Sequence, residues 1–163
     1  MKLVIAGVSG SGKTLIGTLL AEKLGCEFAD ADRFHPPENI AKMSAGIPLT
    51  DEDRADWLDA LGQHLAAHDP IVLACSALKR AYRDRLRALA GQGSLRFIVL
   101  TADIATLKER MSHREHFMPA SLLDSQLATL ELGDDVEVIE NTGNPAEVAS
   151  RIAAVPVRST GAD

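Results

Sequence analysis

The segment Gly7-Val-Ser-Gly-Ser-Gly-Lys-Thr14 constrains this chain most, because it matches the pattern G-x-x-x-x-G-K-[S/T] at every fixed position. Residues 2–6 before it form a short apolar run typical of a buried strand. Residues 14–24 after it have helical spacing and end at Gly25. In a strand–loop–helix unit of this kind, backbone N–H groups surround phosphate oxygens. The sequence therefore predicts a site for a nucleoside triphosphate.

Each residue type in this loop has a chemical reason to be there. Glycines let the backbone turn inward, and we expect Lys13 to reach the β- and γ-phosphates while the Thr14 hydroxyl binds Mg²⁺ directly. The alternative is a glycine-rich turn followed by Lys-Thr by chance, which the flanking strand and helix disfavour. The loop residues expected to hold the nucleotide are Gly7, Ser9, Gly10, Ser11, Gly12, Lys13 and Thr14.

Length and charge exclude several classes of protein. A chain of 163 residues suits one domain, which we expect to span residues 1–157, with a disordered tail at 158–163. A net charge of −6 argues against a general nucleic-acid binder. No apolar run approaches a membrane span, and the first strand leaves no room for a signal peptide. Cys26 and Cys75 fit free thiols in a reducing cytoplasm, so we expect a cytoplasmic protein.

Strand-like and helix-like segments alternate along the chain, which predicts parallel βαβ units with right-handed crossovers. We expect a three-layer α/β/α domain with a five-stranded parallel sheet and ligands at the carboxyl ends of the strands. The strands are expected at residues 2–6, 26–30, 71–75, 95–100 and 136–139. The helices are expected at residues 14–24, 37–45, about 51–69, 77–90, 103–111, 119–130 and 145–154.

Polar residues after the second and third strands are the next candidates. Asp30 and Asp32 follow the second strand, and Asp32 is placed to hold Mg²⁺ through water and to accept a hydrogen bond from a substrate hydroxyl. A solvated turn rich in Asp is the alternative. No acid follows the third strand, so the Walker-B Asp is missing. Ser76, directly after this strand, suits a polar contact to phosphate or sugar. Arg83, further along, suits a contact to a carboxylate.

A charged segment and two histidine pairs have weaker signals. Residues 110–122 suit a mobile lid whose arginines fold over a triphosphate, and a charged loop is an equal alternative. His64 and His68 lie at i, i+4, and His113 and His116 at i, i+3, both of which are metal-ligand spacings. Neither pair has a third ligand nearby in the sequence, so no structural metal is predicted.

Taken together, these segments resemble the gluconokinases, small P-loop kinases related in fold to shikimate kinases. The resemblance spans residues 3–132 in colinear order. Beyond the loop it rests on Asp30-Ala-Asp32 running into His35-Pro36, Asn39, Lys42-Met43, Gly46-Ile-Pro48-Leu49, Asp51-Glu-Asp53-Arg54 before Trp57-Leu58, Cys75-Ser-Ala-Leu-Lys79, Tyr82-Arg83-Asp84, His116-Phe117-Met118, Leu122-Leu123, Ser125-Gln126-Leu127 and Thr129-Leu130-Glu131. Asp56 and Leu132-Gly133 depart from the family pattern where proline is common.

The resemblance implies transfer of the ATP γ-phosphoryl group to the 6-hydroxyl of D-gluconate, with Mg²⁺ as cofactor. It implies catalytic roles for Lys13, Asp32, Arg110 and Arg114, and additional ATP contacts from Arg110, Asn144 and Pro145. A guanidinium suits the substrate carboxylate. The implied gluconate-binding residues are Asp32, His35, Arg54, Ser76, Arg83, His116 and Gln126.

The resemblance makes a homodimer an expectation, although no sequence feature indicates an interface. A shikimate-type kinase is the nearest alternative, but it typically carries a glycine-rich loop after the third strand, where this chain reads Cys-Ser-Ala-Leu-Lys. A nucleotide-dependent switch is the alternative from another class. A GTPase of that class would carry an Asn-Lys-x-Asp motif, which the sequence lacks.

Overall fold

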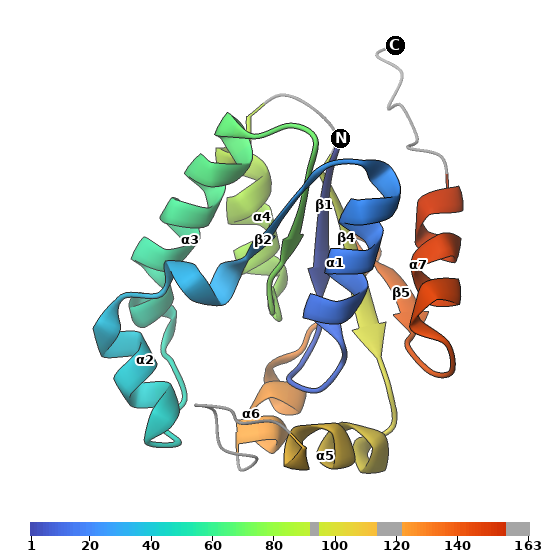
Figure 1. Ribbon diagram of the computed structural model, residues 1–163. Coiled ribbons are helices and arrows are strands. Elements are labelled where there is room, and N and C mark those ends of the chain that lie inside the picture. Colours follow the sequence, from blue (N-terminus) through green and yellow to red (C-terminus); the bar gives the residue numbers. More distant parts are fainter. Residues whose placement is uncertain (92–94, 114–121, 156–163) are drawn as a thin grey trace.

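The computed structural model describes residues 1–91, 95–113 and 122–155 (Figure 1). Its five strands form one parallel sheet in the order β2-β3-β1-β4-β5. This arrangement confirms the predicted three-layer α/β/α class. The expected lid falls largely on residues 114–121 and the expected tail on residues 158–163, which lie outside the described part of the chain.

The strands differ in burial according to their place in the sheet. The inner strands are apolar and largely buried because helices cover both faces, whereas the two edge strands are partly exposed. The bounds are β1 (Lys2–Ala6), β2 (Glu27–Asp30), β3 (Ile71–Ala74), β4 (Leu95–Thr101) and β5 (Glu137–Glu140).

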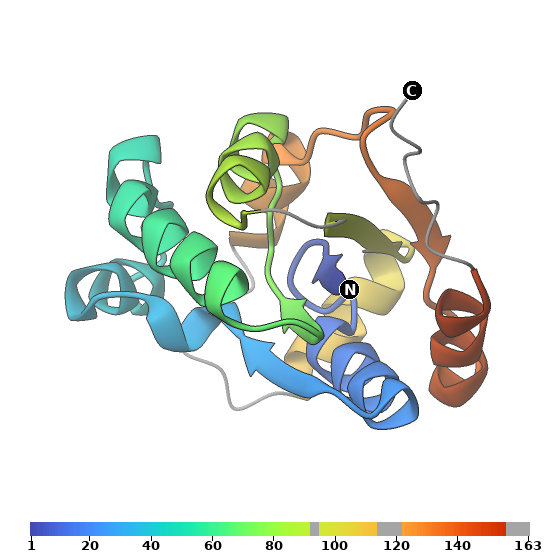
Figure 2. The same cartoon turned by 90° about the horizontal axis from the view of Figure 1, so that it is seen from above.

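Helices cover both faces of the sheet (Figure 2). One apolar core joins the sheet to α3 and α4, a second joins it to α1 and α7, and a smaller cluster includes residues of α5 and α6. The helices are α1 (Lys13–Leu24), α2 (Pro37–Ser44), α3 (Asp51–Ala67), α4 (Arg80–Leu89), α5 (Ile104–Ser112), α6 (Leu122–Thr129) and α7 (Pro145–Ala154), with a 3₁₀ turn, η1 (Ala31–Phe34), after β2.

Local signals explain where several helices begin. Thr50 caps α3: its hydroxyl accepts the Asp53 N–H, and the Asp53 carboxylate accepts the Thr50 N–H in return. Asp103 and Asn144 cap α5 and α7 in the same way, each accepting one backbone N–H. These caps fix where the helices begin relative to the sheet, and so where the intervening loops meet.

Two features differ from the sequence-based expectation. Helix α4 begins at Arg80 rather than at residue 77, because Ala77 has a left-handed φ of 41° and residues 75–79 run as a loop. The η1 turn was not expected; Asp30 caps it by accepting the Asp32 N–H at 3.0 Å. Both changes lengthen the irregular backbone at the carboxyl ends of β2 and β3.

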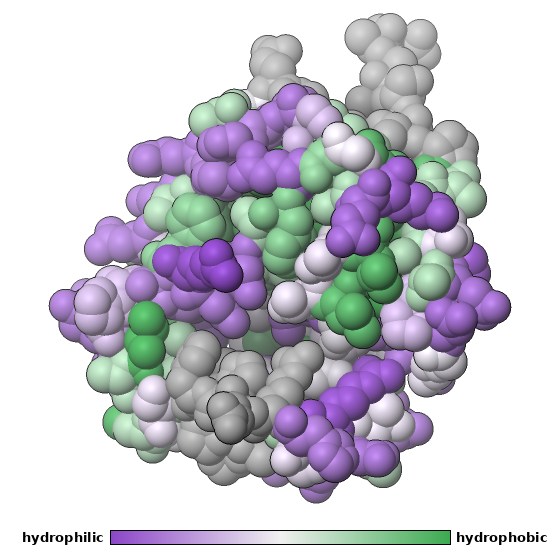
Figure 3. All heavy atoms as spheres, viewed as in Figure 1, coloured by the Kyte–Doolittle hydropathy of each residue, from purple (hydrophilic) through white to green (hydrophobic). Residues whose placement is uncertain are grey.

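Figure 3 shows hydrophilic side chains spread over the visible face, with smaller hydrophobic areas between them. Within the described part of the chain, no helix has both the length and the apolar composition that a membrane span requires.

Candidate active site

The glycine loop after β1 has a backbone that only glycine can supply. Gly10 and Gly12 have φ values of 80° and 96°, in the left-handed region. A Cβ on Gly12 would lie 2.3 Å from Nδ2 of Asn141, and one on Gly10 would lie 2.8 Å from the backbone oxygen of Leu107. Gly12 precedes α1, whose first turn contains no acid, so the positive end of this helix is available to an anion.

Lys13 is the first residue of α1 and folds back over the loop. Its Nζ donates to the backbone oxygens of Gly7 and Val8, at 3.0 Å each. This contact holds the ammonium at the mouth of the loop, beside the exposed Thr14. A phosphate entering the loop would therefore meet an already positioned cation and the backbone N–H groups together.

A cavity of about 520 Å³ opens beside this loop. Its size is in the range of small-molecule sites. The walls come from the loop and α1, the ends of β2 and β3, and helices α2, α3 and α6. The polar lining residues are Ser9, Lys13, Thr14, Asp30, Asp32, Arg33, His35, Arg54, Ser76, Ser125, Gln126 and Thr129. Seven residues that the sequence analysis proposed for catalysis or binding therefore line the same cavity: Lys13, Thr14, Asp32, His35, Arg54, Ser76 and Gln126.

The two acids after β2 lie on the same wall as the phosphate loop. Asp30 shapes the η1 turn, and Asp32 sits in its first turn. Cys75, at the end of β3, is buried close to both Asp32 and Lys13; burial raises the pKa of its thiol to about 12, so the thiol is neutral at pH 7. Two carboxylates, a lysine and a threonine hydroxyl are thus among the groups that line the cavity.

His35 is held as a neutral ring. It stacks on Trp57 with a centroid separation of 4.3 Å and an interplanar angle of 10°. Burial, and then the charge of Arg54, lower its pKa to about 4. Asn39 Nδ2 lies 2.8 Å from the backbone oxygen of Asp53 and 3.2 Å from His35 Nδ1. Because an amide nitrogen only donates, Nδ1 accepts and the ring proton lies on Nε2. His35 is therefore a hydrogen-bond donor without positive charge.

Arg54 also lines the cavity, and hydrogen bonds hold its guanidinium in place. Its Nη1 donates to the backbone oxygen of Leu49 at 2.7 Å and to the Tyr82 hydroxyl at 3.1 Å. The Tyr82 hydroxyl in turn donates to Asp51. Through these hydrogen bonds Tyr82, on α4, holds Arg54 in place, a role that the sequence analysis did not assign to it. An arginine held in this way suits a carboxylate or a row of hydroxyls.

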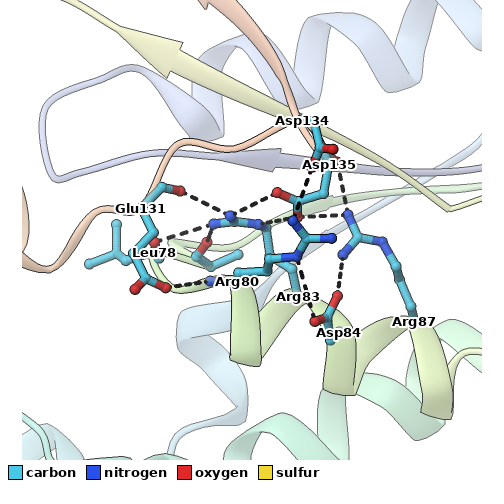
Figure 4. Close-up of polar contacts among 9 residues, drawn as sticks. Leu78, Arg80, Arg83, Asp84, Arg87, Glu131, Asp134 and Asp135 are labelled. Atoms are coloured by element: carbon cyan, nitrogen blue, oxygen red, sulfur yellow. Dashed lines mark hydrogen bonds and ion pairs between the residues drawn. The ribbon is translucent and has the colours of Figure 1, made fainter.

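Arg83, which the sequence analysis expected to contact the substrate carboxylate, is not among the described residues that line the cavity. Figure 4 shows its guanidinium against Asp135, with Nε at 2.8 Å from Oδ2 and Nη2 at 3.1 Å from Oδ1. The same side chain donates to the backbone oxygens of Ala77, Leu78 and Glu131. Arg83 is fully buried and has its donors directed at protein atoms, so it joins the loop after β3 to the segment before β5.

Arg110 lies behind the phosphate loop rather than in the cavity wall. Its Nη1 donates to the Gly10 oxygen at 3.1 Å and its Nη2 to the Asn141 oxygen at 2.7 Å. The Asn141 amide donates to the Ser11 oxygen at 2.8 Å. Gln126, by contrast, lines the cavity, and its Oε1 accepts the Ser9 N–H at 2.7 Å. These contacts brace the loop from both sides.

The remaining expected residues fall into two groups. Asn144 caps α7 by accepting the Ala146 N–H, and Pro145 is the first residue of that helix; neither lines the cavity. Arg114 and His116 lie outside the described residues. Asn39, Tyr82 and Asn141 are positioning residues to which the sequence analysis gave no role. Tyr82 and Asn141 contact partners 28 and 130 residues away, and Asn39 joins His35 to Asp53, 14 residues further on, so no local pattern indicated these contacts. For Asn39 and Tyr82 the available signal was their place in segments that resemble the family.

Comparisons with known proteins agree with this geometry. The family model of shikimate kinases matches residues 9–154. The gluconokinase of Gluconobacter oxydans (strain 621H) is 50% identical over 147 residues, which cover 86% of this chain and 82% of that protein. The chain belongs to the gluconokinase family.

Solved structures of family members and related kinases share the whole fold. A gluconokinase from Sinorhizobium meliloti 1021 superposes with a TM-score of 0.82 at 47% identity, covering 93% of each chain. An unliganded sugar kinase from Janibacter sp. HTCC2649 gives a TM-score of 0.85 at 50% identity, covering 93% of this chain and 91% of that one. The predicted P-loop kinase fold and phosphotransferase class are thereby confirmed.

Proposed function

We propose that this member of the family transfers the γ-phosphoryl group of ATP to the 6-hydroxyl of D-gluconate, giving 6-phospho-D-gluconate and ADP. The observation that carries the proposal is the 50% identity to a gluconokinase over 86% of this chain. The cavity itself fits the reaction, since the phosphate loop and an arginine held by hydrogen bonds both line it.

The nucleotide phosphates are proposed to occupy the loop from Gly7 to Thr14. Lys13 would exchange its two carbonyl contacts for phosphate oxygens, which offer a full negative charge instead of a dipole. Arg110 already holds the loop backbone at Gly10, and we place the nucleotide beside it, with Asn144 and Pro145 near the adenine. Arg114 remains a proposed lid contact.

Several residues that line the cavity fit Mg²⁺. The Thr14 hydroxyl and the carboxylates of Asp30 and Asp32 are hard oxygen donors, the type that Mg²⁺ prefers. We propose that Thr14 holds the ion directly and Asp32 through water. When bound with ATP, the ion neutralises charge on the β- and γ-phosphates.

The acceptor is proposed to lie between the acids and Arg54. Asp32 accepts the hydrogen bond of the 6-hydroxyl and takes its proton as the oxygen–phosphorus bond forms and the bond between γ-phosphorus and the leaving oxygen of ADP breaks. His35 donates from Nε2 to a substrate hydroxyl, and Arg54 binds the carboxylate. Ser76 and Gln126 line the same space, and His116 remains a proposed contact.

The alternatives are not favoured. A shikimate-type kinase shares the fold, but the relatives that match most of this chain at 41–50% identity bear gluconokinase names. A non-catalytic nucleotide switch would not need the cavity beside its phosphate loop to include His35 and Arg54. We also infer a cytoplasmic location and a homodimer; light scattering of the purified protein tests the latter.

The deciding experiment measures ADP release with Mg-ATP against D-gluconate, shikimate, D-glucose and nucleoside monophosphates. Turnover with gluconate alone supports the proposal, and phosphorus NMR of the product identifies the 6-position. Folded protein that releases ADP only with shikimate, or with no acceptor, would overturn the gluconate assignment.

A further inference from the structure

Three potential metal ligands converge away from the active site, where the edge strand β2 meets the last turn of α3. They are Glu27 on β2 with His64 and His68 on α3, and Figures 1 and 2 show the two elements. His64 Nε2 lies 3.2 Å from Glu27 Oε1, and His68 Nε2 lies 3.8 Å from Glu27 Oε2. The histidine pair, which by sequence lacked a third ligand, therefore acquires one from a strand 37 residues away.

One of the two rings is oriented as a metal-binding histidine is. His68 Nδ1 lies 2.8 Å from the backbone oxygen of His64, and because a carbonyl only accepts, Nδ1 carries a ring proton and Nε2, which faces Glu27, is the nitrogen available to a metal. His64 Nε2 donates to the Glu27 carboxylate, so His64 has to carry its proton on Nδ1 instead when it binds a metal through Nε2. A histidine that donates one ring N–H to a carbonyl and offers its other nitrogen is the usual arrangement at metal sites.

The separations suit a small divalent ion after modest side-chain rotation. One ligand atom from each residue lies within 4.8 Å of the others. In a tetrahedral zinc site with bonds of about 2.1 Å, neighbouring ligand atoms lie about 3.4 Å apart. The two contacts to Glu27 are already close to this value, and the imidazoles stack at 4.0 Å. All three side chains are partly exposed, so water can complete the coordination.

Charge and ligand type favour a cation of the zinc class. The cluster lies at the carboxyl end of α3, where the helix dipole is negative, and Glu27 adds a full negative charge. Two imidazoles with one carboxylate suit Zn²⁺ rather than Mg²⁺, which prefers oxygen alone. The neighbouring thiol of Cys26 packs with the core on the α1 side of the sheet, because adjacent strand residues face opposite ways.

We propose that Glu27, His64 and His68 form a binding site for a zinc-class transition-metal ion, separate from the Mg²⁺ of phosphoryl transfer. A bound ion joins the edge strand β2 to α3. Since β2 runs directly into Asp30 and α3 begins near Arg54, the ion fastens together the two elements that carry the acceptor side of the cavity. The proposal does not depend on which sugar acid the cavity accepts.

The test is calorimetric titration of metal-free, untagged protein with ZnCl₂, supported by the visible spectrum of the Co²⁺-loaded protein. We expect one tight site in the wild type and at least about tenfold weaker binding in Glu27→Gln and in His68→Ala. These two variants are preferred to His64→Ala because His64 also packs against Phe34. The matched control is Glu22→Gln, which alters an exposed residue outside both the cluster and the cavity.

Circular dichroism shows whether each variant is folded. Gluconate-dependent ADP release, measured with Mg-ATP and without zinc, gives a second check. The expected pattern is weaker zinc binding in the two ligand variants alone, with loss of the Co²⁺ nitrogen–oxygen spectrum. Any of three results would overturn the proposal. The wild type does not bind zinc, or the ligand variants bind zinc as tightly as the wild type. The third is a control variant that loses as much zinc affinity as the ligand variants.

Discussion

Replacing Arg83 with methionine tests whether this arginine acts in the fold or on the substrate. Methionine keeps most of the apolar stem but leaves the Asp135 carboxylate, whose side chain is only 6% exposed, without its main partner. Removing one partner of a buried ion pair costs about 3–5 kcal/mol. Arg87 still contacts Asp135 at 3.0 Å, so we expect the lower end, about 3 kcal/mol of unfolding free energy.

The pKa of Asp135 gives a second estimate. Hydrogen bonds from Arg83, and to a smaller extent from Arg87, lower it from 3.8 to about 2, which corresponds to about 2 kcal/mol at neutral pH, the larger part of it from Arg83. A lowered carboxyl pKa stabilises the fold above pH 3.8, and this contribution is lost as the pH falls towards 2. Both estimates give a loss of a few kcal/mol in unfolding free energy. The first is larger because it also includes the cost of leaving the backbone oxygens of Ala77, Leu78 and Glu131 without their donor.

Urea unfolding followed by circular dichroism measures the change. Arg85→Met on the same helix is the control, since Arg85 and its partner Asp59 are 48% and 38% exposed, and such pairs contribute about 0–1 kcal/mol. The double variant Arg83→Met, Asp135→Asn should lose less than the single variant because no buried charge remains. A single variant that keeps wild-type stability while its KM for gluconate rises steeply would refute the structural role.

Four further predictions concern the cavity. Lys13→Ala should lower kcat by at least about a hundredfold in a folded protein, because charge stabilisation carries phosphoryl transfer; near-normal turnover would contradict this. Asp32→Ala should lower kcat more than it weakens ATP binding measured by calorimetry, and a collapse of ATP affinity would make it mainly a metal ligand. Arg54→Lys should raise the KM for gluconate about tenfold or more with little change in KM for ATP, since an ammonium cannot replace a bidentate guanidinium. His35, with a pKa lowered from 6.5 to about 4, should make the protein lose stability as the pH falls from 6.5 to 4, and His35→Gln should flatten that part of the unfolding profile.

The sequence predicted those parts of the fold whose signals are local. The apolar run of β1, the glycine at the end of α1 and the Thr50 cap of α3 each lie within a few residues of the boundary they set, and the structure places those boundaries as expected or within one residue. The start of α4 was missed by three residues. Ala77 accepts a hydrogen bond from Arg83, and Arg83 is paired with Asp135. The hydrophobic periodicity of residues 77–90 carries no information about Asp135, so it could not predict the loop conformation at Ala77.

The same distinction applies to the candidate site. The phosphate loop is recognisable because its residues are consecutive, and the acids after β2 because parallel strands bring their carboxyl ends to one edge. The sequence analysis assigned Arg83 to the substrate because an arginine suits a carboxylate. In the structure the carboxylate that Arg83 contacts belongs to Asp135, 52 residues away. The contact between Glu27 and His64 could likewise not be predicted from the sequence, since only the packing of α3 on β2 brings the two side chains together.

The strand order has a consequence for how this fold accommodates different acceptors. β3 lies between β1, which leads into the phosphate loop, and β2, which leads into the acids. Neighbouring strands are about 4.8 Å apart, so the donor and acceptor ends are separated by about 10 Å across the sheet. Residues after β3 and on α2 and α3 fill that fixed width. Changes there can alter the length and polarity of the molecule that fits while the nucleotide end stays the same, so acceptor choice and ATP binding can diverge independently during evolution.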